Sequence, residues 1–369
     1  MKIGILGGGQ LGRMFIQSAL KYDDEIFVLD PSKECSCATI SHFTQGDFND
    51  YDAVYNFGKD KEVLSIEIEH INTDALFDLE AQGVNVIPSP KIISIIQQKI
   101  LQKQFYQNKG IPTPDFQIIH SKSEVDFPLP FVQKMNTGGY DGKGVQIIRT
   151  QEDLSKLWDQ PSVLESLVDI DKELSIIVAK NDSGEIKVFP VTEMVADPQL
   201  NLLDFNICPA QISESVQQQI DVIAKQFIEA AKSSGIFAIE LLLDKEGKVW
   251  VNETAPRLHN SGHQTQEGNA NSQFEQFYRT LKNLPLADTD AFTFSGMLNL
   301  VGEEGYSGKV VYQGLDEVLK MSKTYVHLYG KKDTKPGRKM GHINVLADSR
   351  EELMEKLITI KKMVKVIAE

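Results

Sequence analysis

The chain has 369 residues and a formal net charge of −14, with 41% hydrophobic and 24% charged residues. A single hydrophobic core stops growing at roughly 250 residues, so we expect two or three domains that fold throughout. The acidic balance opposes binding to a polyphosphate backbone, and nucleic acid is excluded as the expected partner. No signal-peptide pattern and no membrane-spanning apolar run is present, so we expect no membrane partner. Three cysteines, with Cys35 and Cys37 two apart, suit reduced thiols of a cytoplasmic protein.

The first ninety residues alternate strand-like apolar runs with helical stretches, which predicts a parallel α/β sheet. We expect a long helix over 92–108, ended by Gly110, as a domain boundary. Beyond it the pattern is mixed, and the expected fold class is α/β and α+β in three domains, 1–97, 98–180 and 181–369. The expected elements are strands at 2–6, 26–29, 63–68, 84–87, 131–135 and 145–148, longer strands from residue 186, a strand pair about 240–255, and helices at 11–21, 73–82, 215–232, 273–282 and from 350.

The sequence GGGQLG at residues 7–12 follows the first expected strand and begins a helix. With Asp30 at the end of the next strand, it matches the dinucleotide-binding pattern. Its physical content is narrower, because glycines only let an anion approach the backbone N–H groups of a helix N-terminus. The phosphate of a mononucleotide would fit equally well, and a structural strand-to-helix turn remains a third interpretation.

A second glycine-rich loop, KMNTGGYDGKG at residues 134–144, joins two expected strands. Backbone donors of such a loop can close over a triphosphate while Lys134 supplies a point charge. The alternative is a loose hairpin turn. It does not account for two lysines flanking Tyr140 and Asp141, so the loop is predicted to bind ATP.

The strand pair about 240–255 carries two glutamates that could bind a metal ion together. If Asp244 pairs with Val249, Glu240 lies opposite Glu253 on the same face. Like charges facing each other are destabilising unless a cation joins them, and hard oxygen ligands suit magnesium beside phosphates. The alternative of two solvated glutamates fits poorly with strands this apolar. Asn252 offers a further oxygen.

Two further segments are weaker candidates. Residues 165–168, ESLV, have backbone groups suited to an adenine edge, with Glu173 as a carboxylate for ribose hydroxyls. The loop APRLHNSGH at 255–263 concentrates an arginine, an asparagine and two histidines directly after Glu253, which indicates a reacting centre.

Together these motifs resemble the ATP-grasp superfamily along essentially the whole chain, and within it the 5-(carboxyamino)imidazole ribonucleotide synthases. The resemblance lies in GGGQLGRM (7–14), GGYDGKG (138–144), NETAPR (252–257), HNSGH (259–263) and PGRKMGH (336–342). It implies an ATP-grasp fold with an N-terminal pre-ATP-grasp domain that binds the ribonucleotide, a lid domain, and a C-terminal domain with the metal site. The implied partners are ATP, bicarbonate and aminoimidazole ribonucleotide, with magnesium as one or two ions and a homodimer as the assembly.

The resemblance also implies roles for individual residues. ATP would be bound by Lys99, Lys134, Gly139, Tyr140, Asp141, Gly142, Lys143, Gly144, Glu165, Ser166, Leu167, Val168, Glu173, Asn252 and Glu253, and magnesium by Glu240 and Glu253. The ribonucleotide would contact Gln10, Leu11, Glu67, Tyr140, Asp141, Asn260, Lys331, Arg338 and Lys339. Catalytic roles would fall to Tyr140, Lys143, His263, Lys331 and Arg338.

Some positions depart from the family pattern. Lys99 and Lys143 stand where many members carry arginine, which keeps the charge and loses the bidentate fork. His70 replaces a common asparagine, and Gln264 replaces an aromatic residue. We expect the roles to survive these changes.

The implied reaction activates bicarbonate, a poor electrophile, as carboxyphosphate. The amine then attacks this intermediate or the carbon dioxide released from it, and Tyr140 or a histidine of the 259–263 loop moves the proton. A nicotinamide-dependent oxidoreductase is the alternative of another class, and it leaves the two glutamates and the second glycine loop without a role. A non-catalytic nucleotide-binding protein is a further alternative, as are the biotin carboxylases and amino-acid ligases that share the ATP half.

Overall fold

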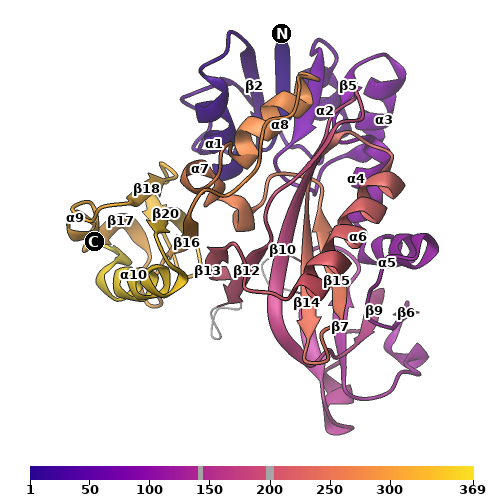
Figure 1. Ribbon diagram of the computed structural model, residues 1–369. Coiled ribbons are helices and arrows are strands. Elements are labelled where there is room, and N and C mark those ends of the chain that lie inside the picture. The colour runs from indigo at the N-terminus through magenta and orange to yellow at the C-terminus, as the bar shows by residue number, and fades with distance from the viewer. Residues whose placement is uncertain (140–143, 197–202) are drawn as a thin grey trace.

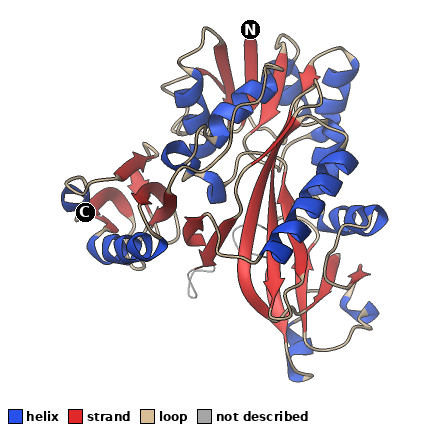
Figure 2. Cartoon of the chain, viewed as in Figure 1, coloured by secondary structure: helices blue, strands red, loops and turns tan. Residues whose placement is uncertain are grey.

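The N-terminal part of the chain is a five-stranded parallel sheet flanked by helices (Figures 1 and 2). The computed structural model describes residues 1–139, 144–196 and 203–369. The strand order is β3-β2-β1-β4-β5, which confirms the expected α/β sheet. In chain order the elements are β1 (Lys2–Leu6), α1 (Gln10–Ala19), β2 (Glu25–Asp30), β3 (His42–Gln45), α2 (Tyr51–Gly58), β4 (Val63–Ile66), α3 (Thr73–Ala81) and β5 (Asn85–Val86). The sequence pattern missed β3, which is a largely exposed edge strand without apolar alternation, and it also missed α2.

The single helix expected over 92–108 is two helices, so this prediction is wrong. They are α4 (Pro90–Ile96) and α5 (Lys99–Lys109). Gln98 between them is extended, with φ −117° and ψ 115°, and the N–H groups of the next two residues bond to Asn136 at 2.9 and 3.0 Å. Gly110 ends α5 in the left-handed conformation, with φ 66°. The break therefore ties the start of α5 to the glycine-rich segment after β7.

A four-stranded antiparallel sheet follows, with the order β6-β9-β7-β8. Its strands are β6 (Phe116–Ile119), β7 (Phe131–Met135), β8 (Val145–Ile148) and β9 (Ser162–Ser166). The strands expected at 131–135 and 145–148 are confirmed to the residue. A small core around Phe131 and Leu164 holds this sheet together.

The largest sheet has nine strands and joins the middle of the molecule to the C-terminal lobe (Figure 1). The path is β15-β14-β10-β12-β13-β16-β20-β18, with β11 paired to β10. Its strands are β10 (Ile170–Lys180), β11 (Ile186–Val188), β12 (Thr192–Ala196), β13 (Leu203–Cys208), β14 (Gly235–Asp244), β15 (Val249–Ala255), β16 (Phe294–Val301), β18 (Thr324–Leu328) and β20 (Lys339–Ala347). Longer strands were expected from residue 186, and β14, β16 and β20 are long, but β11 to β13 are short and the long strand β10 begins before that residue.

Helices cover the large sheet through aromatic contacts. On α6 (Glu214–Ala231), Phe227 packs on Phe237 of β14 with ring centroids 5.4 Å apart. On α8 (Gln273–Leu281), Phe277 packs on Phe15 of α1 at 5.0 Å, which ties the N-terminal sheet to the large one. The remaining elements are α7 (Thr265–Gly268), β17 (Gly308–Gln313), α9 (Leu315–Val318), β19 (Asp333–Thr334), α10 (Arg350–Met363) and β21 (Lys365–Ala368).

The division into 1–97, 98–180 and 181–369 stays a proposal. We note that β10 pairs with β14 along its length and so belongs to the large sheet, before the proposed boundary at residue 180. In the described part of the chain, no helix is both long and apolar enough to cross a bilayer.

Candidate active site

A cleft of about 960 Å³ runs between the N-terminal sheet, the small sheet and the large sheet. Most residues expected at the site line it: Gln10, Leu11, Glu67, Lys99, Lys134, Gly139, Glu165, Ser166, Leu167, Val168, Glu173, Glu240, Asn252, Glu253, Asn260, His263 and Lys339. Gly144, Lys331 and Arg338 are not among the lining residues. Tyr140, Asp141, Gly142 and Lys143 lie outside the described residues. Segments distant in sequence thus converge on one cavity.

Glu240 and Glu253 face each other across β14 and β15, as the hairpin pattern predicts. The expected register is wrong, however, because Leu243 and not Asp244 pairs with Val249. A bulge at Asn252 corrects the offset by one residue, so that the two glutamates are opposite each other after all. The bulge therefore places both carboxylates at the cleft.

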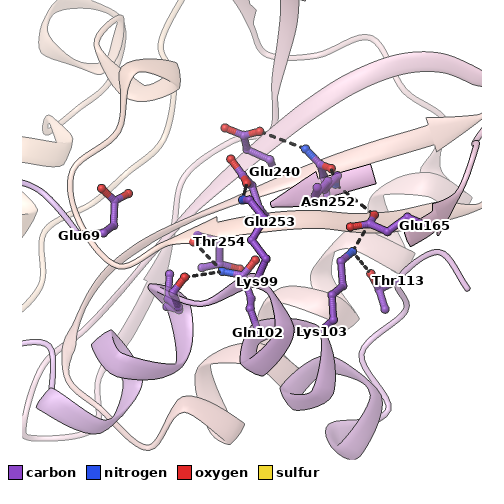
Figure 3. Close-up of polar contacts among 12 residues, drawn as sticks. Glu69, Lys99, Gln102, Lys103, Thr113, Glu165, Glu240, Asn252, Glu253 and Thr254 are labelled. Carbon is purple, nitrogen blue, oxygen red and sulfur yellow. Dashed lines mark hydrogen bonds and ion pairs between the residues drawn. The ribbon is translucent and has the colours of Figure 1, made fainter. Parts of the chain in front are cut away.

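Lys99 and Asn252 lie beside this carboxylate pair (Figure 3). The ammonium of Lys99 forms an ion pair with Glu253, which holds the pKa of that carboxyl well below its usual range. Glu240 Oε1 lies 3.2 Å from Nε2 of His259. Asn252 donates weakly to Glu240 Oε2 at 3.4 Å, while its own amide oxygen accepts from Lys134 at 2.7 Å. Both strands thus present ionised or hydrogen-bonded oxygen groups to the cleft.

This donor set fits magnesium better than a metal that needs a complete protein cage. Among the described residues no cluster of three or more His, Cys, Asp or Glu side chains has the geometry of a metal site. Magnesium is usually bound through one or two carboxylates, with substrate phosphates and water completing the octahedron. Glu240 and Glu253 are the residues that would bind it.

Lys134 lies deeper in the cleft and shares a carboxylate with a second lysine. Its ammonium is 3.1 Å from Glu165 Oε2, and the ammonium of Lys103 is 3.0 Å from the same oxygen. Burial alone would raise the pKa of Glu165, but the two lysines outweigh it and the pKa is lowered. Lys103 was not expected at the site, although its position four residues after Lys99 on one helix places both on the same face.

The predicted adenine and ribose contacts lie along one wall of the cleft. Ser166, Leu167 and Val168 line it directly after Glu165 on β9. Glu173 lines the same cavity from β10, and burial and the nearby Glu240 raise the pKa of its carboxyl. Contact with a nucleotide at these residues stays a prediction.

The histidine-containing loop forms part of a stack of rings. The ring centroids of His263 and His342 are 4.7 Å apart, and those of His342 and His327 are 4.5 Å apart. Burial lowers the pKa of His263 well below its usual value, so this ring is neutral at physiological pH. A ring with a lowered pKa is a weak base. Proton transfer by His263 stays a prediction.

The first glycine turn is filled by the protein's own side chains. The N–H of Gly8 donates to Asp30 Oδ2 at 2.8 Å, and that of Leu11 donates to Glu67 Oε1 at 3.2 Å. A Cβ at Gly9 would collide with the Glu67 carboxylate, so this glycine is needed for close approach of that side chain. The donors that a dinucleotide pyrophosphate requires are thus engaged by carboxylates.

The basic loop near the C-terminus lies on this turn, 321 residues away in sequence. Lys331 donates to Gln10 Oε1 at 3.1 Å and to the carbonyl oxygen of Lys339 at 2.7 Å. Arg338, which is half-buried, donates to the carbonyl oxygen of Asp333 at 2.7 Å. The start of the basic loop therefore contacts the first glycine turn, although the two segments are far apart in sequence.

Sequence reasoning also missed Arg257 as a structural partner of the N-terminal sheet. Its guanidinium lies 2.7 Å from Glu69 Oε1, across the boundary between two sheets. Arg257 belongs to the motif NETAPR, which the sequence analysis had singled out. Its partner Glu69 is 188 residues away, and only the fold brings the two side chains together.

Three family models match the chain. They are the ribonucleotide synthetase preATP-grasp domain over residues 1–97, the ATP-grasp domain over 104–274 and the phosphoribosylaminoimidazole carboxylase C-terminal domain over 295–356. Together with the paired carboxylates and lysines of the cleft, they define an ATP-grasp ligase.

Individual relatives narrow this class. The N5-carboxyaminoimidazole ribonucleotide synthase of Bacillus subtilis is 34% identical, over 96% of this chain and 94% of that protein. A crystal structure of the N5-carboxyaminoimidazole ribonucleotide synthetase from Thermotoga maritima is 40% identical, with a TM-score of 0.93, and the match covers 100% of this chain and 99% of that chain. The Aspergillus clavatus synthase in complex with ADP and 5-aminoimidazole ribonucleotide is 30% identical over 98% of both chains, with a TM-score of 0.89. The chain belongs to the N5-carboxyaminoimidazole ribonucleotide synthase family.

Proposed function

We propose that the protein carboxylates 5-aminoimidazole ribonucleotide with bicarbonate and ATP, giving N5-carboxyaminoimidazole ribonucleotide, ADP and phosphate in purine biosynthesis. The main observation in support of this proposed reaction is that the cleft is continuous. One cavity joins the lysines and carboxylates suited to a nucleotide with Gln10 and Glu67, against which the basic C-terminal loop is folded. An enzyme of this type has to hold ATP and its acceptor side by side.

The first step transfers the γ-phosphoryl group. A bicarbonate oxygen attacks γ-phosphorus, the bond to the β-phosphate oxygen breaks, and carboxyphosphate and ADP form. Lys134 and Lys99 would neutralise the phosphate oxygens by exchanging their present partners, Glu165 and Glu253, for the nucleotide. Magnesium, when bound at Glu240 and Glu253, supplies further positive charge toward the phosphates.

The second step forms the carbon–nitrogen bond. Either the amine of the ribonucleotide attacks the carboxyl carbon of carboxyphosphate and phosphate leaves, or carboxyphosphate first splits into phosphate and carbon dioxide and the amine attacks the carbon dioxide. In both cases the nitrogen loses a proton, for which Tyr140 or a histidine of the 259–263 loop is the proposed acceptor. Carboxyphosphate is labile in water, so the site has to close, and we propose the glycine-rich segment 138–144 as the lid.

We place the ribonucleotide phosphate at Lys331, Arg338 and Lys339. The reason is that the N–H groups of the first glycine turn already bond to Asp30 and Glu67. A phosphate at that turn would have to displace two carboxylates, whereas the basic loop offers positive charge in an acidic protein.

Release of ADP by the purified protein tests the proposal. With bicarbonate and aminoimidazole ribonucleotide both present, ADP is expected at many times the rate seen without the ribonucleotide. Equal ADP release with any other amine acceptor, or none with this one, would contradict the proposed substrate.

We further propose a cytoplasmic homodimer. The proposed location rests on the free thiols of Cys35, Cys37 and Cys208, which suit a reducing compartment. The dimer rests on the family resemblance, and its mass in solution by light scattering would test it.

A further inference from the structure

Lys103 is a buried lysine beside the nucleotide end of the cleft, but it does not line the cleft. Its residue is 1% exposed, and its ammonium reaches Glu165 Oε2 at 3.0 Å and donates to Thr113 Oγ1 at 2.5 Å. Figure 3 shows it rising from α5 toward Glu165, with Thr113 beside it. Such a lysine cannot touch a substrate held in the cleft, so its role has to be exerted through Glu165.

Two ammonium groups therefore share one carboxylate oxygen. Lys134, which does line the cleft, is 3.1 Å from Glu165 Oε2, and its other contact is the neutral amide oxygen of Asn252 at 2.7 Å. The other oxygen, Glu165 Oε1, is buried and has no hydrogen-bond partner among the described residues. With two cations and one anion, the cluster of Lys103, Lys134 and Glu165 has a net charge of about +1 when all three groups are ionised.

A buried carboxylate needs a cation, because an isolated charge in a low dielectric is strongly destabilising. If Lys134 were the only cation on Glu165, it would have to leave that carboxylate unpaired in order to bind a phosphate. A second, permanent cation removes this conflict. The positive charge that remains is available to the ligand.

We propose that Lys103 is a positioning residue that stays paired with Glu165 and so releases Lys134 to the nucleotide phosphates. This inference rests on the proposed use of ATP and deepens it, since it assigns different roles to two lysines on one carboxylate. Lys134 exchanges partners when nucleotide binds, and Lys103 does not.

The protonation of the cluster is consistent with this role. Burial lowers the pKa of Lys103 to about 8, although Glu165 opposes the shift, so the lysine remains mostly charged near neutral pH. The ammonium of Lys103 also lies 5.8 Å from the ring centroid of Tyr106, in a cation–π position.

Calorimetric titration with Mg-ADP tests the inference in a double-mutant cycle. Lys103→Met is expected to weaken Mg-ADP binding by about tenfold or more, since Lys134 becomes the only cation on Glu165. In the Glu165→Gln background the same substitution should change the affinity by less than about threefold, because Lys134 is then no longer bound to a carboxylate. The Michaelis constant for ATP should rise in Lys103→Met, and that for the ribonucleotide should stay unchanged.

Thr113→Val is the matched control, because it removes the other hydrogen bond of Lys103 and leaves the ion pair. Its affinity for Mg-ADP should equal that of the unmodified protein. If Lys103→Met does not fold, Lys103→Gln replaces it, since glutamine keeps a donor to Glu165 without the charge and should weaken Mg-ADP binding as well.

Three results separate this inference from the proposed function. Unchanged affinity in either Lys103 variant, or an equal loss in both backgrounds, overturns the inference alone. An unmodified protein that binds no Mg-ADP overturns both. A protein that binds Mg-ADP and shows the expected coupling, yet does not carboxylate the ribonucleotide, contradicts the substrate and leaves the role of Lys103 standing.

Discussion

The two ends of the cleft are built differently. At the nucleotide end, Lys99 and Lys134 form ion pairs with the carboxylates of Glu253 on β15 and Glu165 on β9, strands of two different sheets. At the ribonucleotide end, Lys331 and Arg338 donate to neutral amide or carbonyl oxygens, in a loop that reaches the N-terminal turn from the far end of the chain. We therefore expect ligand binding at the first end to exchange one charged partner for another, whereas at the second an anion would meet the guanidinium of Arg338, which donates to a carbonyl oxygen.

This difference has an energetic consequence. Removing one member of the buried pair between Lys134 and Glu165 leaves the other uncompensated, so substitution there should affect chemistry and stability together. A charge-assisted contact in an exposed loop can be removed with loss of affinity only. The following substitutions test this contrast.

The largest effect is expected for Glu253→Gln. It removes one charge from the carboxylate pair without a change of volume and leaves Lys99 without its ion-pair partner. Turnover, measured as ADP release, should fall by at least about a hundredfold while the circular dichroism spectrum is retained. Glu246→Gln, an exposed glutamate in the turn of the same hairpin, is the control and should be fully active. Near-normal ADP production by Glu253→Gln would contradict the metal assignment.

A smaller and more selective effect is expected for Arg338→Ala. Loss of one charge-assisted contact should raise the Michaelis constant for aminoimidazole ribonucleotide by roughly ten- to a hundredfold and leave that for ATP nearly unchanged. Steady-state kinetics with each substrate varied in turn measures both constants. Lys332→Ala, which loses only an exposed ion pair with Glu34, is the control.

An equal rise of both constants in Arg338→Ala would mean that the loop supports the fold or the ATP end, and the contrast between the two ends would fail. An unchanged enzyme would make the loop a surface patch.

A modest effect of pH on the free energy of unfolding is expected from Glu67, whose carboxylate occupies the first glycine turn at the ribonucleotide end. Burial raises the pKa of Glu67 to about 7, against the attraction of Arg257. A raised pKa means that its contribution to stability is fully present below about pH 4.5 and is lost as the pH rises through about 7. The free energy of unfolding, relative to Glu67→Gln, should thus fall by about 1 to 3 kcal/mol over this range.

Urea denaturation of both proteins at the two ends of this pH range measures the difference. Glu80→Gln, an exposed position on α3, should follow the unmodified protein throughout. A difference that grows as the pH rises would mean that the carboxylate is stabilised in its charged form instead.

The protein is not expected to bind NADH. The N–H groups of Gly8 and Leu11 already bond to carboxylates, and a pyrophosphate would meet negative charge there. Fluorescence titration should show no measurable binding. Micromolar affinity would make the first glycine turn a dinucleotide site and would revive the oxidoreductase alternative.

Local sequence patterns were sufficient to predict a strand or helix wherever its own residues define it. The strands β7 and β8 and the facing of Glu240 and Glu253 follow from alternation and a turn, and the structure confirms them. The register of that hairpin was wrong by one residue, because a bulge leaves no mark in an apolar pattern. The break between α4 and α5 was also missed, since it depends on hydrogen bonds to Asn136 and not on a helix-breaking residue.

What the sequence by itself determined is the chemistry: which lysines, glutamates and glycines gather in motifs, and hence the family and its use of ATP. The tertiary structure decided how these residues are paired. Lys103 carries no motif, and its role depends on a carboxylate 62 residues away, while Lys331 reaches Gln10 across 321 residues. Such pairings depend on the packing of separate sheets against each other, and no local periodicity encodes a contact between segments that meet only when the chain is folded.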